Sequence, residues 1–96
     1  MDVNVRLFGI LRFLAQERVV KLNIGEGSNV SDVITELGKR LGAHFLSRIV
    51  RAPGELHSYC QIFVNDTQVD DLATQIKPNG RAVEVGIILL AASEGG

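Results

Sequence analysis

The chain has 96 residues, of which 46% are hydrophobic and 22% are charged, and its formal net charge is -1. These values are typical of one globular domain, and the absence of a basic excess argues against a nucleic-acid-binding protein, which must neutralise phosphates. The single cysteine excludes an intrachain disulfide and favours a reducing compartment, and the longest apolar run is too short to span a bilayer. We therefore expect a cytoplasmic domain that binds neither nucleic acid nor a membrane.

Two alternating segments are predicted to open the fold. Val3, Val5 and Leu7 alternate with residues of the opposite face, which predicts a strand with one buried side. The apolar residues 10–15 form a short connection with room for one helical turn. A second alternating strand follows at 20–24, and the short link between the two strands predicts a β-hairpin.

An amphipathic helix is predicted after this hairpin. Its apolar stripe recurs at helical spacing, at Val30, Val33, Ile34, Leu37 and Leu41. Asn29 is suited to the N-cap, Asp32 places an acid in the first turn, and Gly42 is suited to the C-terminal cap. A short second helix is expected within residues 43–50.

The last third of the chain is predicted to be β-structure separated by turns. Residues 59–64 are rich in strand-forming side chains, and turn sequences stand at 52–55, 65–66 and 78–80. The final strand, at 83–89, carries apolar residues on both faces. We therefore expect it to lie in the middle of the sheet and to be buried on both sides.

The element order β-β-α-β-β predicts an α+β domain of the β-grasp, or ubiquitin-like, type. It consists of a mixed sheet of four to five strands with one main helix packed across it, and the first and last strands lie side by side. We assign the β-grasp domain to residues 1–90 and a flexible C-terminal tail, ending in Gly-Gly, to residues 91–96.

No catalytic or metal-binding constellation stands out inside this domain. The two histidines, His44 and His57, have no Cys/His cluster around them at metal-ligand spacing. Cys60 is a nucleophile only if a base lies nearby, and His57, three positions earlier, is expected on the opposite face. We interpret Cys60 as a small packed residue.

The remaining polar motifs also favour structural roles. Gly25-Glu26-Gly27 precedes a helix but lacks the lysine of a phosphate-binding loop, so a plain turn is expected. The spacing of Asp66, Asp70 and Asp71 fits no calcium loop. Arg40, Arg48 and Arg51 are interpreted as either a basic patch or ordinary charged surface.

The terminal glycines are the candidate that remains. Glycine has no side chain beside its carbonyl, which leaves an activated acyl group at Gly96 open to attack. Gly95 extends the range of backbone conformations that would let such a tail enter a narrow channel. Residues 91–94 are small or polar and would supply reach.

The chain resembles the small sulfur-carrier proteins of the MoaD/ThiS type. The resemblance rests on the opening strand and its following "LR" turn, the capped helix start, the "VND" strand end and the Gly-Gly terminus, which here are residues 5–12, 29–33, 62–66 and 95–96. Residues 54–57 look most like the branch that supplies sulfur for cysteine synthesis and like the archaeal ubiquitin-like modifiers.

This resemblance implies a carrier rather than an enzyme. An E1-like enzyme would use ATP to adenylate Gly96, and a persulfide or sulfide would convert it to a thiocarboxylate that donates sulfur for molybdopterin, thiamin, cysteine or tRNA thiolation. Gly95 would allow passage into the enzyme's channel. The implied partners are that activating enzyme and a sulfurtransferase or sulfur-accepting synthase; no bound cofactor is implied, and the free carrier would be a monomer.

The partner is expected to bind the exposed apolar surface of the sheet. Phe8, Phe63 and Leu90 are the predicted contacts, with Glu94 in the tail. Many relatives have Pro-Pro before the final residues, whereas Glu94 here precedes the glycines, which argues against assigning molybdopterin synthase specifically. Two alternatives remain open: a protein modifier conjugated to lysines through Gly96, and a β-grasp binding module without tail chemistry.

Overall fold

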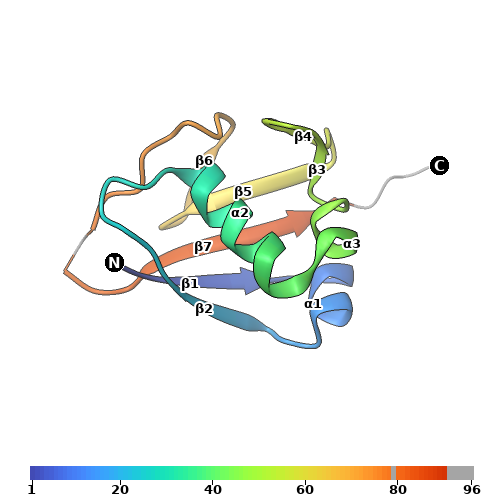
Figure 1. Cartoon of the computed structure of the whole chain (residues 1–96), viewed down its shortest axis with the longest axis horizontal. Coiled ribbons are helices and arrows are strands. Elements are labelled where there is room, and N and C mark those ends of the chain that lie inside the picture. The colour runs from blue at the N-terminus through green and yellow to red at the C-terminus, as the bar shows by residue number, and fades with distance from the viewer. Residues whose placement is uncertain (79, 91–96) are drawn as a thin grey trace.

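The computed structural model describes residues 1–78 and 80–90, and the predicted tail, residues 91–96, lies outside this part of the chain. A five-stranded mixed sheet has the strand order β2-β1-β7-β5-β6 (Figure 1). Its strands are β1 (Asp2–Leu7), β2 (Val19–Asn23), β5 (Cys60–Val64), β6 (Thr67–Val69) and β7 (Val83–Leu89). The other elements are α1 (Ile10–Ala15), α2 (Val30–Leu41), α3 (Ala43–Leu46), β3 (Val50–Ala52) and β4 (Glu55–Leu56).

The main helix, α2, forms where its apolar stripe predicts. The Asn29 side chain accepts a hydrogen bond from the Asp32 backbone N–H at 2.9 Å, and the Asp32 carboxylate accepts one from the Asn29 N–H at 2.9 Å. This reciprocal capping box satisfies two backbone donors that the first turn of a helix leaves without partners. The buried side of α2, comprising Val30, Val33, Ile34 and Leu37, packs on the sheet.

The first and last strands pair in the middle of the sheet, as predicted. β1 and β7 are parallel, with Val5 opposite Val85 and Leu7 opposite Ile87. β1 also pairs with β2 in the predicted antiparallel hairpin. Alternate residues of β1 and β7 point toward α2 and form the centre of the core. The fold is therefore the expected α+β sheet with one main helix across it.

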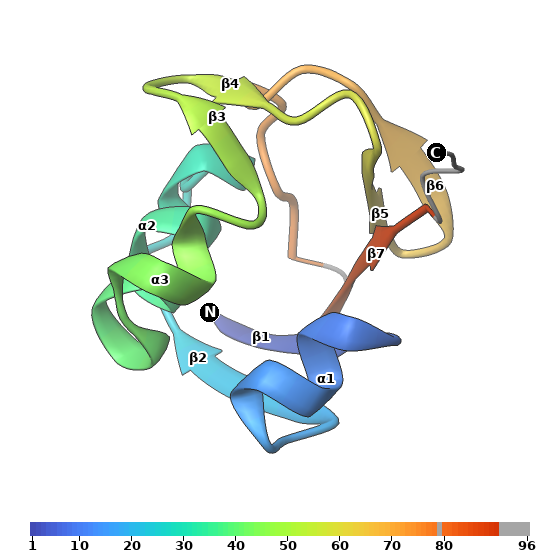
Figure 2. The same cartoon turned by 90° about the vertical axis from the view of Figure 1, so that its right-hand side faces the viewer.

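The prediction that β7 is buried on both sides is wrong. Val83, Val85 and Ile87 are buried, whereas Gly86 and Ile88 on the opposite face are only half-buried. Figure 2 shows why: α2 and α3 lie on one side of the curved sheet, and no described element covers the other side. We call this uncovered side the open face.

Three short strands were not predicted. β6 follows β5 through a tight turn at Asn65 and Asp66, both with positive φ, and β3 pairs with β4 in a separate two-stranded sheet. The predicted turn at Pro53-Gly54 joins β3 to β4. None of the described helices combines the length and the apolar character needed to cross a bilayer.

Candidate functional site

The predicted chemical group, the carboxylate of Gly96, lies outside the described residues, as do Gly95 and Glu94. The structure does place Leu90, the residue after which the tail begins. The Leu90 N–H donates a hydrogen bond of 2.8 Å to the Tyr59 carbonyl, next to the paired residues Cys60 and Leu89. Residues 91–96 therefore start at the end of the central strand β7.

Phe8 and Phe63 come together on the open face, around Gly86. Phe63 lies opposite Gly86 in the antiparallel pairing of β5 and β7. A Cβ atom built on Gly86 would lie 3.5 Å from Cε2 of Phe8 and 4.0 Å from Cβ of Phe63. The two aromatic side chains thus flank Gly86 in the middle of β7, at distances that are ordinary van der Waals contacts for a methyl group.

The strand alternation continues this apolar surface toward the tail. Gly86, Ile88 and Leu90 occupy every second position of β7 and its extension, so the three share the open face. Leu90 is 45% exposed and Phe8 is 47% exposed. We call Phe8, Phe63, Gly86, Ile88 and Leu90 the open-face patch. The three predicted contact residues of the domain are therefore part of one surface beside the root of the tail.

The opposite end of the open face is polar. Glu84 accepts a hydrogen bond from Nδ2 of Asn4 at 2.9 Å and one from Nε of Arg6 at 3.0 Å. The bond from Asn4 is the largest cause of the lowered pKa of the Glu84 carboxyl. Burial opposes it, and the bond and positive charge of Arg6 lower the pKa further. The open face thus changes from charged at the start of β7 to apolar at its end.

Sequence reasoning missed Gly86 and Ile88 as members of this surface. Both were assigned to a buried strand. The signal that could have found them is the shared parity of residues 86, 88 and 90, which places Ile88 and Gly86 on the same side as the predicted contact Leu90.

Cys60 does not pair with a base. Its side chain is buried, and burial raises the pKa of the thiol from 9.0 to about 11. The ring of His57 instead stacks on Tyr59, with 4.8 Å between ring centroids, and its Nε2 lies 2.8 Å from the Ser47 carbonyl oxygen. The interpretation of Cys60 as a packed residue is confirmed. Among the described residues, no three potential metal ligands gather into a site.

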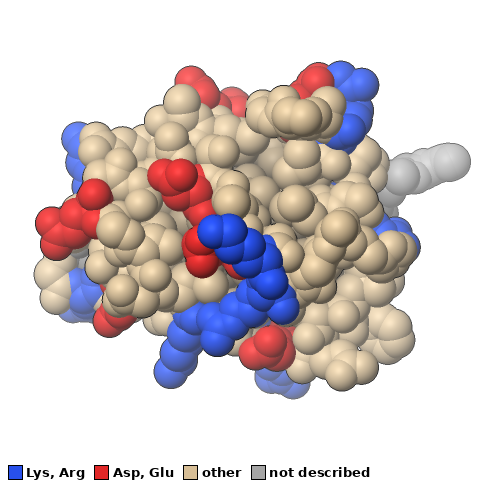
Figure 3. Space-filling model, viewed as in Figure 1, with Lys and Arg blue, Asp and Glu red and all other residues tan. Residues whose placement is uncertain are grey.

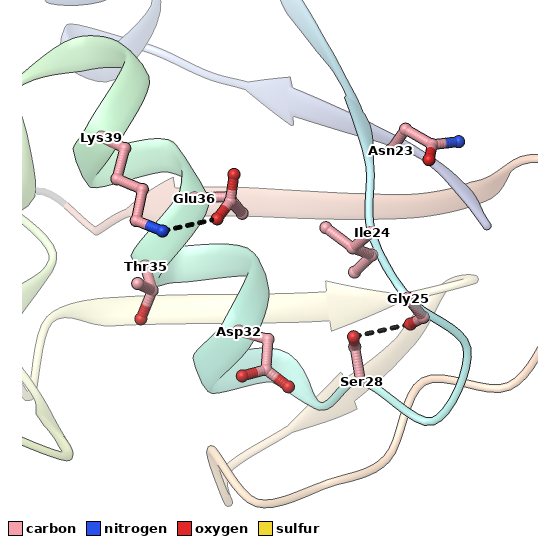
Figure 4. Close-up of a pocket in the computed structure, with 8 residues that line it drawn as sticks. All are labelled: Asn23, Ile24, Gly25, Ser28, Asp32, Thr35, Glu36 and Lys39. Atoms are coloured by element: carbon pink, nitrogen blue, oxygen red, sulfur yellow. Dashed lines mark hydrogen bonds and ion pairs between the residues drawn. The ribbon is translucent and has the colours of Figure 1, made fainter.

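The glycine-containing loop before α2 is a turn, as predicted. The Ser28 hydroxyl donates a hydrogen bond of 2.6 Å to the Gly25 carbonyl. A hollow of about 450 Å³ lies beside it, between this loop and α2 (Figure 4). Glu36 is paired with Lys39 at 3.1 Å in its wall, and Asp32 serves the capping box. The carboxylates of Asp32 and Glu36, which line the hollow, disfavour a bound phosphate by like-charge repulsion.

Two of the three arginines considered as a basic patch make local contacts, as residues of an ordinary charged surface do. Arg40 donates to the Lys21 carbonyl, and Arg51 pairs with Glu55. Figure 3 shows Lys, Arg, Asp and Glu interspersed on the face that carries α2. This mixture provides no single-sign surface for an anionic polymer.

Comparison with known proteins gives a consistent result. A model of the ThiS family matches residues 5–85. SAMP1 from Haloferax volcanii superposes with a TM-score of 0.79 over 100% of both chains, at 21% identity, which bears on the fold alone. CysO from Mycobacterium tuberculosis is 27% identical, with a TM-score of 0.72 over 93% of this chain and 99% of that one.

A chain of the BexX/CysO complex from Amycolatopsis orientalis is 28% identical, with a TM-score of 0.73 over 98% of this chain and 99% of that chain. A comparison with curated protein sequences found no significant match.

Proposed function

Because this chain belongs to the ThiS family, we propose that it is a sulfur carrier whose Gly96 is converted to a thiocarboxylate. The observation that carries the proposal is the position of the open-face patch. Phe8, Phe63 and Leu90 form one apolar surface that ends where residues 91–96 begin. A partner bound to this surface has its own active site within reach of the tail.

The proposed chemistry needs two partner-catalysed steps. An oxygen of the Gly96 carboxylate attacks the α-phosphorus of ATP, and the bond from that phosphorus to the oxygen bridging to the β-phosphate breaks. Pyrophosphate departs, and an acyl-adenylate is formed. Hydrosulfide then attacks the acyl carbon, the bond to AMP breaks, and a thiocarboxylate remains. With a persulfide donor the product is an acyl disulfide, which a thiol must reduce to release the thiocarboxylate.

This chain contributes the acyl group and the docking surface rather than the catalysis. An E1-like adenylating enzyme supplies the ATP site, and a sulfurtransferase or sulfur-accepting synthase completes the cycle. The complex of CysO with BexX shows that a protein 28% identical over almost its whole length associates with another protein. We place the carrier in the cytoplasm, where ATP is available and Cys60 stays reduced.

The chemistry of the thiocarboxylate determines the class of molecule that can accept its sulfur. A thiocarboxylate is a sulfur nucleophile, so its acceptor must offer an electrophilic carbon or another activated group. Activated precursors of sulfur-containing cofactors, of cysteine and of thiolated tRNA all meet this requirement. The resemblance of residues 54–57 to the cysteine branch favours an amino-acid acceptor among them.

A reconstituted ATP–pyrophosphate exchange assay tests the activation step. The full chain, the E1-like enzyme of the same organism, ATP and labelled pyrophosphate are combined, and formation of labelled ATP is measured. We expect exchange with the full chain and none after deletion of Gly96. An unchanged circular-dichroism spectrum of the deletion variant serves as the control for folding. Exchange that persists without Gly96 would contradict the proposal.

A protein modifier is the second candidate, and it shares the adenylation step. The observation that favours it is the likeness in fold to SAMP1, a small archaeal modifier protein, along its full length. Peptide mapping of total cell protein distinguishes the two functions. Gly96 joined to lysine side chains indicates a modifier, whereas a thiocarboxylate without such adducts indicates a dedicated carrier.

A further inference from the structure

Every large apolar side chain that stands out as exposed in the described residues lies at one end of the molecule. These side chains are Phe8, Ile10, Phe13, Tyr59 and Leu90. Apolar residues scattered singly over a surface are normal, whereas a cluster of this kind on a small protein marks an interaction site. Phe8 and Leu90 are part of the open-face patch. Ile10 and Phe13, on α1, are not explained by it.

Helix α1 holds these two residues outward. Leu11 is fully buried and anchors the helix, while Phe13 is 76% exposed and Ile10 is 47% exposed. Ile10 and Phe13 are three positions apart, so they are neighbours on one side of the helix. A helix of six residues gains little stability from its own hydrogen bonds. Its exposed aromatic ring therefore has no evident role in folding. We call Ile10 and Phe13 the α1 ridge.

The α1 ridge lies at the same end as the root of the tail. β1 and β7 are parallel, with Leu7 opposite Ile87, so α1 begins beside the end of β7 (Figure 1). Leu90, hydrogen-bonded to Tyr59, continues from that end. On the face shown in Figure 3, the surface over α1 and α3 is largely free of charged residues, although α1 carries Arg12. Leu90, the last described residue, thus lies at the same end of the domain as the α1 ridge.

The length of chain beyond Leu90 limits where a partner can sit. Six residues span at most about 20 Å when fully extended. An enzyme that acts on Gly96 must therefore bring its active site within that distance of Leu90, and its surface must meet this end of the domain. At this end of the domain, the apolar features that the surface of the enzyme can contact are the open-face patch and the α1 ridge.

We propose that the α1 ridge, Ile10 and Phe13, is a docking surface for the enzyme that adenylates Gly96, opposite an apolar rim at the mouth of that enzyme's tail channel. This inference rests on the proposed function. The ridge and the open-face patch both lie at the end of the domain from which the tail continues. Burial of an exposed aromatic side chain at a protein interface is a common source of binding energy.

Steady-state kinetics of the exchange reaction test the proposal. The double substitution Ile10→Ser/Phe13→Ser removes the ridge without a change in charge. We expect the KM for the carrier to rise about tenfold or more while kcat stays unchanged, because only docking is impaired. Ile10→Leu/Phe13→Leu keeps the apolar surface and should restore most of the affinity. Gln75→Ser, beside the start of α2, is the control at the other end.

The outcomes separate this inference from the proposed function. No exchange with the unaltered chain contradicts both. Normal exchange with an unchanged KM for the double Ser variant contradicts the ridge alone, and so does a variant that is adenylated normally but fails only in sulfur transfer. Sedimentation analysis tests the alternative that a second copy of the chain binds the ridge. If the unaltered chain is a dimer and the double Ser substitution dissociates it, a second copy covers the ridge and the proposal is overturned. Thermal unfolding should be the same for all variants, since both side chains are exposed.

Discussion

The ring of Phe8 lies over Gly86, where a Cβ atom would be 3.5 Å from Cε2 of the ring. This contact joins the end of β1 to the middle of β7 and forms the centre of the open-face patch. A glycine inside a central strand is unfavourable for the strand itself. Here the Phe8 ring leaves room for a methyl group at position 86 but not for a branched side chain in the same place.

Substitutions at Gly86 should separate the stability of the strand from the shape of the patch. A methyl group fits at an ordinary van der Waals distance, so Gly86→Ala should raise the free energy of unfolding by about 0.5–1 kcal/mol by restricting the unfolded chain. Gly86→Val adds methyl groups that displace the Phe8 ring, and the KM in the exchange assay should rise. Urea unfolding and exchange kinetics measure the two effects. A loss of stability in the Ala variant would contradict this account of Gly86.

Removal of the helix cap should weaken the domain. In Asn29→Ala the Asp32 N–H loses its side-chain acceptor at the start of α2, and we expect the free energy of unfolding to fall by about 1 kcal/mol. Asn29→Asp keeps an acceptor oxygen at the same position and is the matched control. Equal stabilities of the Ala and Asp variants in urea would show that the cap contributes nothing.

Cys60 should react slowly in the folded protein. Its pKa of about 11 instead of 9.0 lowers the thiolate fraction at pH 8 roughly a hundredfold, and burial restricts access further. Absorbance measurements with a thiol-reactive disulfide reagent should show a slow reaction that becomes fast in concentrated urea. Rapid reaction of the folded chain would indicate that Cys60 is accessible and would reopen its role as a nucleophile.

The charged end of the open face should make a small pH-dependent contribution to stability. The pKa of Glu84 is lower in the folded state, so its ionised form stabilises the fold above the unfolded-state pKa. This stabilisation is lost as the pH falls through the folded-state value. Because Glu84 is partly exposed, the contribution should stay below about 1 kcal/mol. The unaltered chain should therefore be slightly more stable than Glu84→Gln at pH 7, and the difference should shrink as the pH falls through the folded-state pKa of Glu84. A pH-independent difference would contradict the assignment.

The helix α2 could be predicted from the sequence because the residues that define it are close together in the chain. The capping residue Asn29 and the apolar stripe of α2 are adjacent in the sequence, so the helix and its start could be read directly. The pairing of β1 with β7 is non-local, but it followed from two strongly apolar strands that need the middle of a sheet. β6, with three residues, is too short for an alternation to show.

The error at β7 has a physical cause that the sequence does not carry. Ile88 and Leu90 look the same in a sequence whether a second layer covers them or a binding partner does, so β7 was expected to be buried on both sides. The convergence of Phe8 and Phe63 on Gly86 depends on strand register, which side-chain pattern alone does not specify. The exposure of Phe13 on α1 could not be predicted either, because a short apolar segment is equally suited to a buried connection.

Intact mass spectrometry of the chain purified from its own cells tests the central claim most directly. We predict a fraction of molecules whose mass is raised by the exchange of one oxygen for one sulfur, with fragmentation placing the sulfur on Gly96. Alkylation should trap this species, and deletion of Gly96 should abolish it. A terminus that carries only oxygen, in cells where the E1-like enzyme is present and active, would contradict the assignment of this chain as a sulfur carrier.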